Sequence, residues 1–137
     1  MGRLDALMKA AREENWVFVD RSISRLNRDS EYYKWAYPDG IRDPNDNIRD
    51  LAVSIIERSD IPEREFALMR KPLHGLMLRD SNRYVRFRAA FALANHGPEN
   101  YREEVIEKLN EAAKDKEVKE IARDYLSKLR PKLRSRQ

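Results

Sequence analysis

The side chains most often used in catalysis are sparse in this sequence. It contains no cysteine and two histidines, His74 and His96, which excludes disulfides, cysteine nucleophiles and metal sites built on cysteine. The sequence also lacks a Gly-x-Ser-x-Gly motif and a glycine-rich phosphate loop. We therefore predict a protein that is not an enzyme and that carries no cofactor and no metal.

The remaining polar candidates have structural interpretations. His96 precedes Gly97 and is expected at the end of a helix, where the helix dipole favours histidine. Acidic residues are numerous, but their positions are typical of solvated helix faces. We expect no carboxylate to lie in an apolar setting that would raise its pKa.

The excess of positive charge is concentrated at one end of the chain. The net charge is +4, from 28 basic and 24 acidic residues. Residues 128–137 contain five basic residues and no acidic one, so 23 basic residues stand against 24 acidic ones elsewhere. A basic tail permits non-specific phosphate binding, but the near-neutral body does not by itself predict a nucleic-acid-binding protein. The 38% of charged residues resembles the composition of proteins from hot environments.

Apolar residues recur at the helical spacing of three and four, and no segment alternates as a strand does. We expect an all-α protein of seven or eight helices. No apolar run approaches the roughly 20 residues of a membrane span, and no signal peptide is evident, so we expect a soluble, cytoplasmic protein. Pro72 is expected to kink or divide its helix. The expected helices cover 3–27 (one helix, or two broken near Glu14 and Asn15), 32–37, about 45–58, about 62–78, 82–96, 100–113 and 116–129.

A pattern near residue 48 returns near residue 85. Ile48 and Val85 are each followed directly by Arg and, four positions on, by Ala. An Asp stands five positions before each of them. The offset is 37 residues, enough for two antiparallel helices. A weaker third copy begins at Val118, where Lys replaces Arg. Such self-similarity is typical of stacked helical repeats.

The spacing has a physical interpretation. An Asp before a helix accepts backbone N–H bonds at its start. An Arg one turn into the helix can reach its own Asp or the Asp of the adjoining repeat. A small Ala in the middle of the helix lets the next helix approach closely.

These residues resemble the HEAT-repeat family in its short, phycobilisome-lyase-like form. The resemblance implies a short right-handed α-solenoid of antiparallel helices, with Asp43, Arg49, Asp80 and Arg86 in a structural ladder. It divides the chain into an N-terminal cap or diverged repeat (1–40), repeats over 41–130 (about 43–79, 80–114 and a partial 115–130) and a basic tail (131–137). The paired His-Glu motifs of the di-iron members are absent. A compact helical bundle, with coincidental repeats, is the competing interpretation.

The resemblance also implies a protein-interaction or scaffold module whose second helices, about 62–78 and 100–113, line a concave side. Half of the 12 aromatic residues fall within 16–37, which indicates a binding platform or a plug over the first repeat. The partner is expected to be another protein or a second copy of the chain, with nucleic acid as the alternative. The candidate contact residues are Arg64, Arg70, Lys71, His74, Arg102, Glu103, Lys108, Trp35 and Tyr37.

Overall fold

The computed structural model describes residues 2–26 and 32–129, and the described residues form helices and connecting turns without a strand. The predicted all-α class and the number of helices are confirmed. The predicted tail, residues 131–137, lies outside the described residues. The elements are α1 (Arg3–Arg12), α2 (Trp16–Ser24), α3 (Tyr32–Ala36), α4 (Asp46–Arg58), α5 (Glu63–Arg79), α6 (Arg83–His96), α7 (Arg102–Ala112), α8 (Lys119–Leu129) and two short 3-10 helices, η1 (Gly40–Arg42) and η2 (Glu99–Tyr101).

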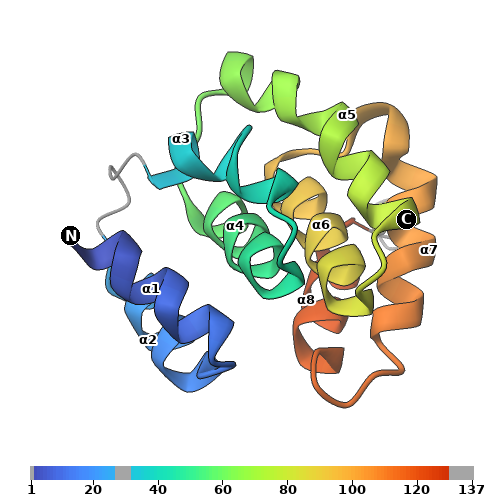
Figure 1. Ribbon diagram of the computed structural model, residues 1–137. Coiled ribbons are helices and arrows are strands. Elements are labelled where there is room, and N and C mark those ends of the chain that lie inside the picture. The colour runs from blue at the N-terminus through green and yellow to red at the C-terminus, as the bar shows by residue number, and fades with distance from the viewer. Residues whose placement is uncertain (1, 27–31, 130–137) are drawn as a thin grey trace, which may run out of the picture.

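The N-terminal segment is two helices rather than one. The chain turns at Glu14, whose φ of 60° lies in the left-handed region. Asn15 then caps α2 by accepting the backbone N–H of Phe18 at 3.3 Å. This cap directs α2 back along α1, so the two helices form a hairpin (Figure 1).

Pro72 does not divide its helix, because α5 continues through it from Glu63 to Arg79. Proline has no N–H to offer the carbonyl one turn earlier, at Leu68. Leu68 is 66% exposed, so that carbonyl lies on the solvent side of the helix, where water can replace the missing donor.

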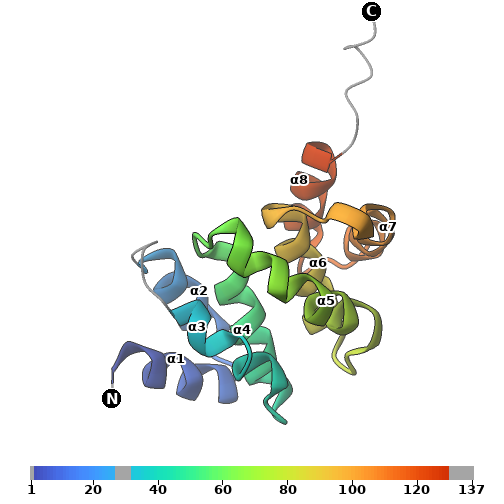
Figure 2. The same cartoon turned by 90° about the horizontal axis from the view of Figure 1, so that it is seen from above.

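The centre of the molecule is the pair α4 and α6. Helix α6 packs against α4, α5, α7 and α8, while α4 also contacts α1 and α3. Seen from above, α2 and α8 lie on the same side of the α4–α6 pair but apart from each other (Figure 2). One cluster of buried apolar side chains extends from Leu7 in α1 to Leu126 in α8.

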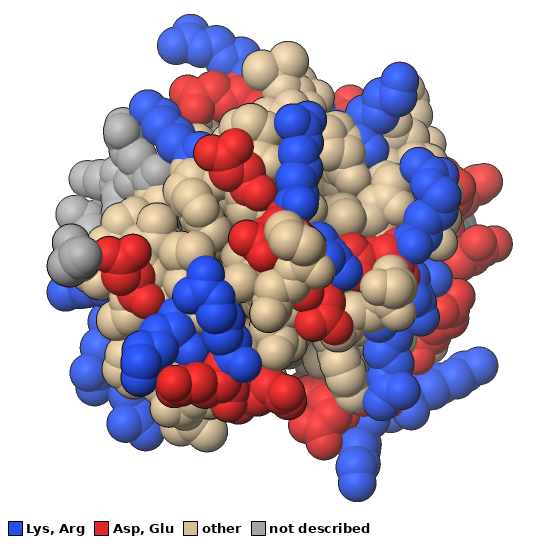
Figure 3. Space-filling model, viewed as in Figure 1, with Lys and Arg blue, Asp and Glu red and all other residues tan. Residues whose placement is uncertain are grey.

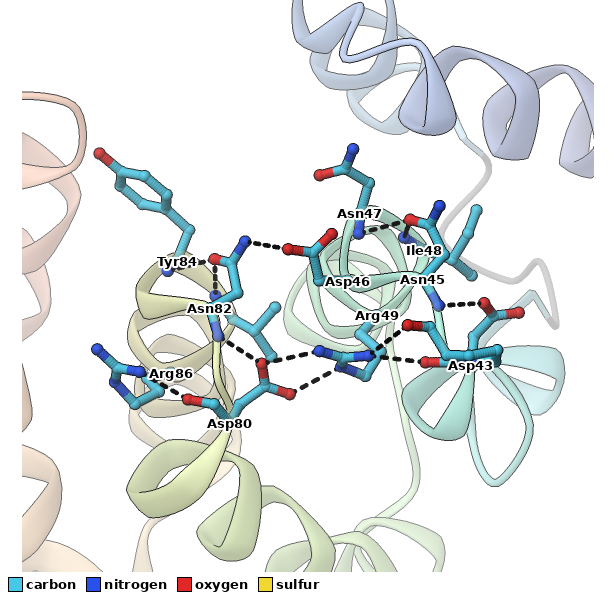
Figure 4. Close-up of polar contacts among 12 residues, drawn as sticks. Asp43, Asn45, Asp46, Asn47, Ile48, Arg49, Asp80, Asn82, Tyr84 and Arg86 are labelled. Carbon is cyan, nitrogen blue, oxygen red and sulfur yellow. Dashed lines mark hydrogen bonds and ion pairs between the residues drawn. The ribbon is translucent and has the colours of Figure 1, made fainter.

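The turns that precede α4 and α6 have the same hydrogen bonds, as Figure 4 shows. Asp43 and Asp80 each accept the backbone N–H of the residue two positions on, at 2.8 and 2.9 Å. Those residues, Asn45 and Asn82, cap the helices by accepting the N–H groups two and three positions further on. Asp115 accepts the N–H of Glu117 at 2.9 Å before α8 in the same way. The sequence repeat is thus matched by repeated local structure.

Gly40 marks the closest approach between α4 and the segment before it. A Cβ atom at Gly40 would lie 2.7 Å from the Cβ of Ala52 and 3.0 Å from the Trp35 ring. We therefore expect Gly40→Ala to destabilise the fold by about 1–3 kcal/mol through overpacking. Gly75, inside α5, meets only the flexible end of Arg79, so Gly75→Ala is expected to stabilise the helix by up to about 1 kcal/mol. Urea unfolding of both variants checks the opposite signs.

Candidate functional site

Arg49 joins the two repeat turns. Its Nε and Nη2 donate to the two carboxylate oxygens of Asp80 at 2.8 and 3.1 Å, and its Nη1 donates to the carbonyl of Asp43 at 2.9 Å. The Asp80 side chain is 4% exposed. The hydrogen bond to this carboxylate raises the pKa of Arg49. Arg49 therefore contacts both its own aspartate and that of the next turn (Figure 4).

Arg86 occupies the equivalent position in α6. Among the described residues, it contacts its own aspartate but not the aspartate of the next turn. Its Nη1 donates to the carbonyl of Asp80 at 2.6 Å. The next aspartate, Asp115, is contacted instead by Arg83, with Nε at 3.1 Å, and by the hydroxyl of Tyr84 at 3.2 Å. The four ladder residues thus lie together, but the arginine pattern changes after one repeat.

Two candidate contact residues on α5, Arg70 and His74, make contacts within the molecule. Arg70 donates to the carbonyl of Gly97 at 2.8 Å and forms an ion pair with Glu63. His74 lies 2.7 Å from a carboxylate oxygen of Glu104 and stacks on another ring in η2. These contacts tie α5 to the segment that contains η2 and α7.

The other candidates do not gather at one place. Arg64, Lys71 and Glu103 are exposed, and Arg102, Lys108, Trp35 and Tyr37 are half-buried. Lys108 forms an ion pair with Glu111 at 3.2 Å within its own helix. The ring of Trp35 covers Gly40. The α5–α7 layer is therefore largely a set of internal contacts with single exposed charges between them.

A groove lies on the other side of the α4–α6 pair. We call this cavity of about 380 Å³ the α4–α6 groove. It is bounded by α2, α4, α6 and the turn before α8. The groove therefore lies on the side of the α4–α6 pair where Figure 2 shows α2 and α8 separated from each other. Its lining residues are Trp16, Asp20, Asp50, Tyr84, Arg88, Glu117 and Val118.

The floor of the groove contains a buried ion pair. Nε of Arg88 lies 2.6 Å from Oδ1 of Asp50, whose residue is 6% exposed. The Ser54 hydroxyl lies 3.4 Å from the same carboxylate oxygen. Burial raises the pKa of Asp50, and the positive charge of Arg88 opposes that shift. The prediction that no carboxylate lies in such a setting is wrong.

Glu57 continues the same stripe of α4, because positions 50, 54 and 57 fall on one helix face. It is 5% exposed, and its Oε2 accepts the hydroxyl of Tyr125 at 2.7 Å. Its other oxygen, Oε1, has no hydrogen-bond partner among the described residues. Burial raises the pKa of Glu57 as well.

The rim of the groove combines aromatic rings with carboxylates. Trp16 and Tyr84 come from α2 and α6, and Asp20 and Glu117 come from α2 and the turn before α8. The Asp20 carboxylate is 56% exposed and lies 3.5 Å from Arg58. Aromatic faces next to carboxylates can bind a cationic group through both charge and stacking.

A second hollow, of about 530 Å³, contains the other histidine but has a structural explanation. It is lined at the ends of α4 and α6 by residues that include Asn95 and His96. His96 Nε2 donates to the carbonyl of Ile56 at 2.7 Å, and Asn95 donates to that of Glu57 at 2.8 Å. These bonds satisfy the free carbonyls at the end of α4, and burial lowers the pKa of His96.

No family model matches the sequence, and neither the curated proteins nor the solved structures contain a match. Within residues 2–26 and 32–129, no three or more metal-binding side chains come together. No helix in these ranges is long and apolar enough to cross a membrane. The groove itself is therefore the basis for the functional argument.

The buried charge of Glu57 has a testable effect on stability. Its pKa is higher in the folded than in the unfolded chain, so the folded chain binds more protons and the free energy of unfolding falls as the pH rises through the folded-state pKa. Asp50 raises this pKa further, while Tyr125, Arg58 and Arg88 oppose the shift. We expect Glu57→Gln to gain stability relative to wild type as the pH rises from the ordinary glutamate pKa of 4.5 towards neutral, by about 1.4 kcal/mol for each pKa unit removed.

Urea unfolding across that pH range measures the difference. Glu103→Gln, an exposed substitution of the same kind, serves as the control for the loss of a carboxylate. A pH-independent difference for Glu57→Gln would contradict the burial argument.

Proposed function

We propose that this chain is a non-enzymatic binding module built from HEAT-like helical repeats, and that its α4–α6 groove holds a segment of another protein. The observation that carries the proposal is the groove itself: a hollow of about 380 Å³ bounded by three helices, with aromatic and charged side chains at its rim. Concave sites with a few convergent polar groups are typical of binding sites.

The repeat interpretation is supported by the matching turns before α4, α6 and α8. The contact between Arg49 and Asp80 joins the first two of these turns. A solenoid of such units stacks its helices in a row and leaves a continuous surface along one side. We propose that the surface formed by α2, α4, α6 and the start of α8 is that side. This differs from the expectation that α5 and α7 line it.

A catalytic role is less well supported. A carboxylate with a raised pKa in a cleft is a common feature of active sites, and Asp50 lines the groove. However, this carboxylate is paired with Arg88 at 2.6 Å, and Glu57 is not among the residues that line the groove. A buried network of this kind also perturbs pKa values for structural reasons.

Nucleic-acid binding is the second alternative. The groove is lined by three carboxylates and one guanidinium, an arrangement that repels phosphate. On the face shown in Figure 3, acidic and basic side chains are interspersed rather than gathered by sign. Titration with duplex and single-stranded DNA at two salt concentrations tests this alternative, and tight binding that persists at high salt would overturn our ranking.

The direct test is photo-crosslinking in cells of the native host. A photoreactive residue is placed at position 117, in the groove, or at position 103, on the exposed face of α7. We expect a discrete protein adduct, with a partner or with a second copy of the chain, from position 117 only. Adducts from position 103 alone would assign binding to the α5–α7 layer, and adducts from neither position would contradict the proposed function.

A further inference from the structure

The chemistry of the α4–α6 groove defines the kind of segment that fits it, if the groove is the binding site proposed above. We infer that the groove binds an arginine side chain from a basic segment of the partner, with the guanidinium against the rings of Trp16 and Tyr84 and close to the carboxylates of Asp20 and Glu117. The argument rests on charge and on the aromatic rim.

The charge of the lining favours a cation. Its charged groups are the carboxylates of Asp20, Asp50 and Glu117 and the guanidinium of Arg88. Arg88 is committed to Asp50 at 2.6 Å. Asp20 is 3.5 Å from Arg58 and largely exposed, and the Glu117 carboxylate forms no ion pair with a described residue. Complementary charge steers association and excludes acidic partners.

The aromatic rim favours arginine over lysine. The planar guanidinium is weakly hydrated and stacks on aromatic faces, whereas the ammonium group of lysine is compact and strongly hydrated. A guanidinium of the chain already covers one face of Tyr84, because the central carbon of Arg83 lies 4.8 Å from the ring centroid, so the peptide arginine must use the remaining face or edge of this ring. Trp16 provides a second aromatic face across the groove, and tryptophan is the best ring for cation–π contacts.

The test uses short peptides that differ at one kind of residue. A peptide of alternating arginine and glycine is titrated against the full chain, beside matched peptides that carry lysine or citrulline in place of arginine. Trp35→Phe leaves Trp16 as the single tryptophan, so its emission reports directly on the groove. We expect the arginine peptide to shift this emission and to bind roughly tenfold more tightly than either matched peptide.

Variants of the exposed carboxylates locate the contact without disturbing the core. The double substitution Asp20→Asn with Glu117→Gln should lower the affinity for the arginine peptide roughly tenfold or more. The matched double substitution Asp124→Asn with Glu103→Gln, on exposed positions outside the groove, should leave binding unchanged. A second comparison is Trp16→Ala against Phe18→Ala, measured by titration calorimetry because Trp16 is the fluorescent reporter. Both residues are in α2, but only Trp16 lines the groove, so only Trp16→Ala should weaken binding of the arginine peptide.

Three results would overturn the inference. One is equal affinity for the arginine and citrulline peptides, and another is unchanged binding after neutralising Asp20 and Glu117. The third, a roughly tenfold gain in affinity when the basic residues of segment 130–137 are replaced by serine, would overturn the assignment to a partner, because it would show that the chain's own tail competes for the groove. Either of the first two results together with a crosslink at position 117 leaves the binding function intact and rejects only the arginine.

Discussion

Asp80→Ala is expected to reduce the free energy of unfolding by about 3 kcal/mol or more, because the substitution leaves the Arg49 guanidinium without its carboxylate. Asp80 is 4% exposed at its side chain, accepts two bonds from Arg49 and caps the turn before α6 through the N–H of Asn82. Since small domains are stable by about 5–15 kcal/mol, the loss is large enough to appear directly in a urea unfolding curve.

The matched control is Asp124→Ala. Asp124 also forms an ion pair, with Lys128 at 3.2 Å, but both side chains are more than 60% exposed. Exposed pairs contribute about 0–1 kcal/mol, so this variant should unfold close to wild type. Asp80→Asn keeps an acceptor for the Asn82 N–H but loses the charge, and should be intermediate. If Asp80→Ala lost no more stability than Asp124→Ala, the contact between Arg49 and Asp80 would not contribute measurably to the free energy of unfolding.

The sequence repeat narrows the partners of Arg49 to its own aspartate and the aspartate of the adjoining repeat, and Arg49 contacts both, the second across 31 residues of sequence. Asp43 and Asp80 precede their helices by the same number of residues, and Arg49 follows at a fixed position. The geometry of one helical turn then limits which groups Arg49 can reach. The same reasoning did not extend to Arg86, because the next aspartate, Asp115, stands 35 rather than 37 residues after Asp80 and is contacted by Tyr84 and Arg83 instead.

The groove could not be predicted in this way. Asp50, Ser54 and Glu57 follow each other at helical spacing opposite the apolar face of α4, a pattern that normally indicates contact with water. These residues are buried because α6 and α8 cover that face, through Arg88 and Tyr125. The packing of helices distant in sequence decides this burial, and helical periodicity does not contain that information.

The repeat itself gives no signal for the buried stripe. At the 37-residue offset, positions 50, 54 and 57 of α4 correspond to Phe87, Phe91 and Ala94 of α6, which are apolar. Arg88 and Asn95, which contact Asp50 and the carbonyl of Glu57, stand 38 residues after positions 50 and 57, one position outside the repeat frame.

Arg88→Met is expected to destabilise the fold by about 3 kcal/mol at neutral pH, because Asp50 is then buried without a counter-ion. Protonation of Asp50 should relieve part of this cost, since burial already raises its pKa. The loss should therefore shrink as the pH falls. Urea unfolding of the variant at neutral and mildly acidic pH measures both effects.

Asp50→Leu combined with Arg88→Met removes the pair as a whole. Replacing a buried ion pair by apolar side chains is often neutral or stabilising, so we expect the double variant to recover most of the stability lost by Arg88→Met. The coupling energy from the double-mutant cycle should be about 2–3 kcal/mol. If the stability loss of the double variant equalled the sum of the losses of the two single variants, the two groups would not act as a pair.

The double variant also separates stability from binding. If an apolar floor serves the fold as well as Asp50 and Arg88 do, then the fold does not require the pair, and its presence at the base of a groove calls for another explanation. Our proposal supplies one, because the pair forms a polar floor of no net charge beneath the carboxylates of Asp20 and Glu117, which supply the negative charge that an arginine meets in the groove. A folded double variant that binds the arginine peptide as tightly as wild type would show that the floor contributes nothing to recognition, and the rim residues Trp16, Tyr84, Asp20 and Glu117 would then have to account for all of it.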